Sequence, residues 1–77
     1  MLSREAAIDV LENKPNQKIT HRFFGSDEYI YSKNGLVYDE RGYLFEDWAS
    51  EGSGKHDGIR ARVGGAWEDG WSLYEEG

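Results

Sequence analysis

The sequence predicts an α+β fold in which a short N-terminal helix packs on a small antiparallel sheet, a meander, in a single domain over residues 1–77. Three observations predict this fold. Apolar residues recur at helical spacing near the N-terminus, short runs rich in Tyr, Ile and Phe follow, and turns that contain glycine separate these runs. A chain of this length buries only about 60% of its unfolded surface, so its core is thin.

The helix is expected to begin after Ser3, because a serine side chain can accept hydrogen bonds from the free N–H groups of the first turn. Ala7, Val10 and Leu11 form one apolar stripe at helical spacing. Pro15 cannot continue the helix. A helix this short is not stable alone, so the stripe must dock on the sheet.

Four strands are expected next, within Lys18–Phe24, Glu28–Ser32, Leu36–Asp39 and Tyr43–Phe45. Between the second and third, Asn34-Gly35 is a strong signal for a two-residue hairpin, since both residues tolerate the positive φ angles that such turns require.

A similar turn is expected at Arg41-Gly42. If both turns are two-residue loops, Tyr31 faces Tyr38, and Tyr38 faces Phe45. This arrangement predicts a row of aromatic rings on one face of the sheet. The opposite face would carry Ile30, Val37 and Leu44.

The rest of the chain reads as a loop over Glu46–Gly58, with Trp48 as a lone large ring inside it. A short strand is expected at Ile59–Val63, before Gly64-Gly65, and a final strand at Trp71–Tyr74 closes the sheet.

The composition bounds the function. The formal net charge of −6 argues against direct nucleic-acid binding, which needs cations to neutralise phosphates. The absence of cysteine excludes disulfides and fits a cytosolic protein. No apolar run is long enough to span a membrane, and residues 1–11 do not resemble a secretory signal. The acidic residues either keep the protein soluble or mimic nucleic acid by occupying the DNA-binding groove of another protein.

A basic cluster in this acidic chain marks a candidate site for an anion or nucleotide. Lys55, Arg60 and Arg62 could hold a phosphate or carboxylate, and Trp67 or Trp71 could stack a base. The alternative is a solvated loop whose charges offset nearby acids. The segment contains Gly-Ser-Gly-Lys without the spacing of a Walker loop, which excludes an NTPase.

Catalysis and metal binding have little support in the sequence. His21 and His56 have no metal-ligand spacing, and no Ser-His-Asp arrangement has a supporting context. We therefore expect no enzymatic activity and no cofactor. Arg22, Tyr31 and Tyr38 are further ligand-binding candidates. The surplus of aromatic rings over a thin core favours a homo-oligomer.

Both ends of the chain carry short motifs beside the predicted helix. A basic-hydrophobic-x-Arg-x-x-aromatic pattern falls on Lys18, Ile19, Arg22 and Phe23-Phe24, and an Asp-Trp-x-hydrophobic pattern falls on Asp69-Gly70-Trp71 with the glycine inserted. With these motifs the chain resembles small phage proteins of the Thoeris anti-defence 2-like group, which open with a short amphipathic helix and the first pattern and close with the second. The middle differs, because the relatives carry a longer segment where this chain has two tight hairpins.

The resemblance implies a phage-encoded protein that counters bacterial immunity in the host cytoplasm. Members of the wider group either sequester nucleotide immune signals as oligomers or inhibit CRISPR nucleases. The expected partner is therefore a nucleotide signalling molecule, held by the basic cluster. The alternative is a host defence protein whose basic groove binds the acidic residues of this chain.

Overall fold

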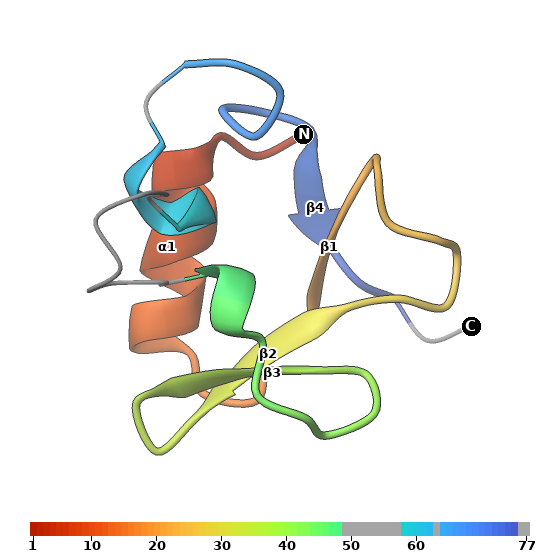
Figure 1. The fold of residues 1–77 in the computed structure, drawn as a ribbon. Helices are drawn as coiled ribbons and strands as arrows, with labels where there is room; N and C mark the ends of the chain where they lie inside the picture. The colour runs from red at the N-terminus through yellow and green to blue at the C-terminus, as the bar shows by residue number, and fades with distance from the viewer. Residues whose placement is uncertain (49–57, 63, 76–77) are drawn as a thin grey trace.

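The computed structural model describes residues 1–48, 58–62 and 64–75. The elements in chain order are α1 (Arg4–Asn13), β1 (Ile19–His21), β2 (Ile30–Lys33), β3 (Leu36–Asp39), the 3-10 helices η1 (Glu46–Trp48) and η2 (Ile59–Ala61), and β4 (Trp71–Leu73). The strands form one antiparallel sheet in the order β3-β2-β1-β4, and α1 lies along one side of it (Figure 1). The expected α+β class is confirmed, with β1, β2 and β3 as the meander and β4 added beside β1.

Helix α1 begins as the sequence predicts. The Ser3 side chain accepts a hydrogen bond from the backbone N–H of Ala6 at 3.1 Å. Ala7 and Leu11, two residues of the apolar stripe, are buried against the sheet. Capping and burial together hold a helix of only 10 residues.

The C-terminal end of α1 is completed by the sheet. The Leu11 carbonyl would normally accept from the N–H group four residues later, but Pro15 occupies that position and has none. The Ser32 hydroxyl, from β2, donates to the Leu11 carbonyl oxygen instead, at 2.5 Å. Ser32 is itself buried, so this bond fixes the helix end against the sheet.

The core lies between α1 and the sheet. Trp71 and Ile19 are fully buried on adjacent strands, and Ile30 is buried beside them on β2. Trp48, expected as a lone ring in a loop, is buried on η1 and packs edge-to-face on Trp71 with ring centroids 5.8 Å apart. Because both rings serve the core, neither is available as an open ligand platform.

The first hairpin turn is confirmed. Asn34 and Gly35 have φ angles of 53° and 82°, as a two-residue loop requires, and the register places Tyr31 opposite Tyr38.

The second turn differs from the prediction by one residue. Its loop holds three residues, 40–42, because the backbone N–H of Asp39 bonds to the carbonyl of Tyr43 and Tyr38 lies opposite Leu44. A one-residue slip turns each side chain to the other face of a sheet. Phe45 therefore packs on Phe24, at 6.1 Å, and does not extend the ring row.

Asp39 stabilises this longer turn. Its side chain accepts hydrogen bonds from the backbone N–H groups of Arg41 and Tyr43, at 2.9 and 3.1 Å. Partial burial works to raise the pKa of Asp39. The two N–H groups and the Arg41 guanidinium outweigh that effect, so the pKa lies below its usual range.

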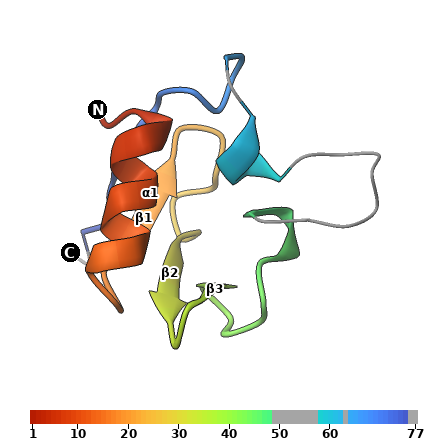
Figure 2. The ribbon, with the colours of Figure 1, turned by 90° about the vertical axis from the view of Figure 1, so that its left-hand side faces the viewer.

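Two expected strands are absent from the described residues. The segment Tyr43–Phe45 forms one isolated bridge, between Leu44 and Tyr38, where a strand was expected. In the expected strand Ile59–Val63, Val63 lies outside the described residues and the part before it contains η2, which lies next to η1 (Figure 2). Ile59 of η2 is buried.

The buried Arg4 of α1 ties the C-terminal part of the chain to the helix. Its Nε bonds to Oε2 of Glu68 at 3.2 Å, and its Nη1 donates to the carbonyl of Arg60 at 2.5 Å. The backbone N–H of Gly64, at 2.7 Å, and the Arg4 guanidinium both lower the pKa of Glu68. This network positions the chain that leads into β4.

Candidate functional site

Four tyrosine rings form a continuous row across the sheet on the side away from α1. Tyr74 and Tyr29 have ring centroids 4.6 Å apart, Tyr29 and Tyr31 are 6.2 Å apart, and Tyr31 and Tyr38 are 6.0 Å apart. We call these four residues the tyrosine row. All four side chains are half-buried, so each ring keeps part of its surface open to solvent.

The strand pleat and the register explain why these rings meet. Neighbouring side chains of a strand point to opposite faces, so Ile30 enters the core while Tyr29 and Tyr31 point away from it. Tyr38 joins them through its pairing with Tyr31. Tyr74 follows β4, and its backbone N–H bonds to the carbonyl of Lys18 at 2.9 Å, which brings the end of the chain beside β1.

A cation lies at the tyrosine row. The Nζ atom of Lys18 is 4.7 Å from the ring centroid of Tyr29. The antiparallel register that pairs Ile19 with Ile30 also places Lys18 opposite Tyr31. None of the strand residues that alternate to this face is acidic, although the whole chain has a net charge of −6. Aromatic surface and positive charge are therefore combined on this face.

This arrangement suits a planar, anionic ligand. Tyrosine rings stack on bases of any identity because every base has a π-face, and each such stack contributes about 1–3 kcal/mol. An ammonium group near the rings supplies a point charge for a phosphate or carboxylate.

Two residues of the predicted basic cluster, Arg60 and Arg62, lie in the part of the chain that the structure describes. Nη2 of Arg60 is 2.6 Å from Oε1 of Glu12, so an acidic residue of the chain already neutralises this guanidinium. Arg62 is exposed at the end of η2. Lys55 and His56 lie outside the described residues.

Trp71, one of the two rings predicted to stack a base, lies in the core. Its ring is fully buried, and its Nε1 donates to the carbonyl of Trp67 at 2.8 Å. Trp67 is half-buried, and its ring packs on His21 at 4.3 Å. Both rings thus belong to the core and its border, because a thin core recruits the largest apolar side chains.

Arg22 has a local structural role. Its Nη1 is 3.2 Å from Oδ1 of Asp69, and its side chain lies against Gly70. The positive φ of Gly70, 89°, and this close approach explain why glycine stands before Trp71.

His21 is a buried structural residue. Its Nδ1 accepts from the backbone N–H of Phe23 at 3.1 Å, and its Nε2 lies 2.7 Å from the carbonyl oxygen of Asp69. The first bond makes Nδ1 the acceptor, so Nε2 carries the proton. Both ring nitrogens are used, and no group of three or more His, Asp or Glu side chains suited to a metal occurs in the described residues.

Sequence reasoning found half of the tyrosine row. Tyr31 and Tyr38 were expected as neighbours, and the structure brings them together. Tyr29 was missed, although its position two residues before Tyr31 is a sufficient signal. Tyr74 was missed because only the pairing of β4 with β1 brings it to this face.

Among the described residues, no helix is long and apolar enough to cross a membrane. Comparisons of the chain with protein-family models, curated proteins and solved structures found no match.

Proposed function

We propose that this protein is a binding module, without catalytic activity, that captures a nucleotide on the tyrosine row. The observation that carries the proposal is the continuous row Tyr74–Tyr29–Tyr31–Tyr38, with Lys18 over one of its rings. A base stacks on the rings, and Lys18 neutralises a phosphate. Tyr31 and Tyr38, whose ring planes differ by only 30°, form the flattest part of the platform.

The resemblance to the Thoeris anti-defence 2-like group suggests a biological setting for this chemistry. In that setting the protein is encoded by a phage, acts in the host cytoplasm as a homo-oligomer, and removes a nucleotide immune signal. The exposed apolar side chains Phe23 and Leu73 are available for contacts between subunits. Native mass spectrometry of protein purified from cells with active defence systems tests this setting. A protein that sequesters a nucleotide should retain an added mass of nucleotide size.

Calorimetric titration with adenosine and AMP tests the chemistry. We expect the double substitution Tyr31→Ala and Tyr38→Ala to weaken AMP binding at least 10-fold, since a lost stack costs about 1–3 kcal/mol. Tyr43→Ala is the matched control, because Tyr43 is 65% exposed and lies outside the row. Lys18→Gln should weaken AMP binding and leave adenosine binding unchanged.

Equal AMP affinity for the double variant and for Tyr43→Ala would refute the assignment of the site. The fold of each variant is checked by circular dichroism. Arg60→Ala removes the ion pair with Glu12, and the proposal expects it to leave AMP binding unchanged.

A second candidate function is inhibition of a defence nuclease by an acidic surface. The observation that favours it is an exposed stripe of carboxylates, Glu5, Asp9 and Glu12, at helical spacing along α1. A basic groove of a partner would face this stripe. Charge reversal at Glu5 and Asp9 should abolish capture of such a partner and leave AMP binding intact, which separates the two functions.

A further inference from the structure

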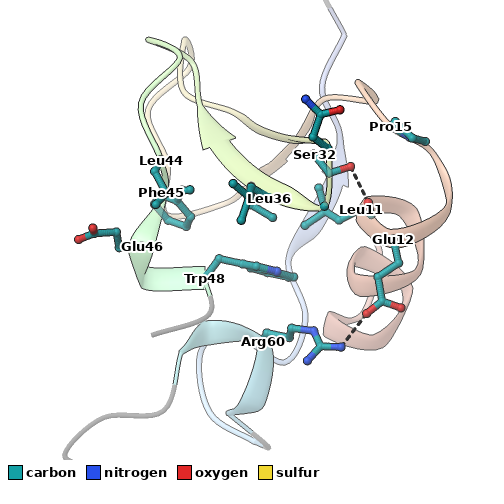
Figure 3. A pocket seen from close by; sticks show the side chains of 13 residues that line it. Leu11, Glu12, Pro15, Ser32, Leu36, Leu44, Phe45, Glu46, Trp48 and Arg60 are labelled. Atoms are coloured by element: carbon teal, nitrogen blue, oxygen red, sulfur yellow. Dashed lines mark hydrogen bonds and ion pairs between the residues drawn. The ribbon is translucent and has the colours of Figure 1, made fainter. Parts of the chain in front are cut away.

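A second ligand site is suggested by a cavity of about 630 Å³ whose lining includes no residue of the tyrosine row. It lies between the end of α1, the β2–β3 hairpin and η1, with Trp48 along one wall and Leu36 and Phe45 along the facing wall (Figure 3). Leu11 contributes from the helix. This volume, with a lining that combines apolar side chains and a few polar groups, is typical of sites for small molecules.

Three charged side chains line the cavity, and two of them form an ion pair with each other. Arg60 and Glu12 stand together at one side and form an ion pair of 2.6 Å. Glu46 stands at the opposite side of the opening, is exposed, and forms no ion pair with a described residue (Figure 3). Because the charges of Arg60 and Glu12 neutralise each other, this pair does not select the charge of a ligand. The carboxylate of Glu46 attracts a positively charged group.

We infer that this cavity binds a small molecule that combines an apolar body with a protonated amine. The body packs between Trp48 and Leu36, and the amine lies at Glu46. The proposal is independent of the tyrosine row, because the two sites share no residue.

Titration with tryptamine, followed by two-dimensional amide NMR of the full chain, tests this inference. We expect saturable shifts, with a dissociation constant on the order of 1 mM, centred on Leu36, Phe45 and the indole N–H of Trp48. Indole-3-acetate has the same apolar body with a negative group, and it should bind several-fold more weakly because Glu46 repels it.

Two substitutions in η1 separate the amine contact from general charge effects. Glu46→Gln should weaken tryptamine binding about two- to five-fold, as expected for an exposed ion pair. Asp47→Asn removes a neighbouring exposed carboxylate that does not line the cavity, and it should leave binding unchanged. Leu36→Ala, at a half-exposed position that tolerates change, should weaken both probes.

Three results would overturn the inference. They are the absence of saturable shifts with tryptamine, equal affinity for tryptamine and indole-3-acetate, and equal effects of Glu46→Gln and Asp47→Asn. Each leaves the tyrosine row untouched, since AMP binding is measured separately.

Discussion

The bond from Ser32 to the end of α1 makes a quantitative prediction. Replacement of Ser32 by alanine removes the hydroxyl that donates to the Leu11 carbonyl at 2.5 Å. Pro15 offers no N–H group as a substitute, and Ser32 is only 5% exposed, so water cannot easily replace the bond. A buried carbonyl without a partner costs about 1–3 kcal/mol.

This loss is large for a chain of this size. A domain of 77 residues has a total stability of about 4–12 kcal/mol. With a urea m-value of about 1 kcal/mol per M, a loss of about 2 kcal/mol lowers the unfolding midpoint by about 2 M while the m-value stays the same. Urea unfolding followed by far-UV circular dichroism measures the change.

Ser72→Ala is the matched control. Ser72 is a half-buried serine of β4 on the opposite face of the sheet, and it caps no helix carbonyl. Its replacement should change stability by less than about 0.5 kcal/mol. Equal losses for the Ser32 and Ser72 variants would refute the argument that the sheet completes the helix.

Three further predictions concern the core, a turn and acid pH. Trp71→Ala should cost about 3–5 kcal/mol and lower the urea midpoint by about 3–5 M, as urea unfolding followed by near-UV circular dichroism would show. Gly70→Ala should cost more in urea unfolding than Gly42→Ala. Both glycines have positive φ, but only at Gly70 would the added Cβ meet Arg22, at 3.0 Å. Because the pKa of Asp39 is lowered in the folded protein, its ionised carboxylate stabilises the fold at neutral pH. This stabilisation is lost as the pH falls below about 4. The wild type should therefore be more stable than Asp39→Asn in urea at pH 7, and the difference should vanish near pH 2.

Local chemistry let the sequence predict the helix and the first hairpin. Ser3 caps α1 through its own first turn, and Asn34-Gly35 sets the register of β2 and β3 by backbone geometry. The pairing of Tyr31 with Tyr38 followed from that register. These features depend on residues a few positions apart, which is the range over which sequence patterns act.

Local sequence patterns did not predict the length of the second turn. The turn after Asp39 takes three loop residues because the Asp39 carboxylate accepts from the N–H groups of Arg41 and Tyr43. That bonding shifts the register by one residue and sends Phe45 to the core side. The similarity of Arg41-Gly42 to Asn34-Gly35 hid the difference, since a comparison of these two dipeptides leaves out the Asp39 carboxylate that precedes the second one.

The sequence by itself determined the fold class, the start of the helix, the first hairpin and the acidic composition. Only the tertiary structure decided which aromatic rings became core and which became surface. Trp48 and Trp71 are buried because a thin core needs their area, and the pairing of β4 with β1 aligned Tyr74 with Tyr29. Burial and strand order arise from contacts between residues distant in sequence, so local sequence patterns do not predict them.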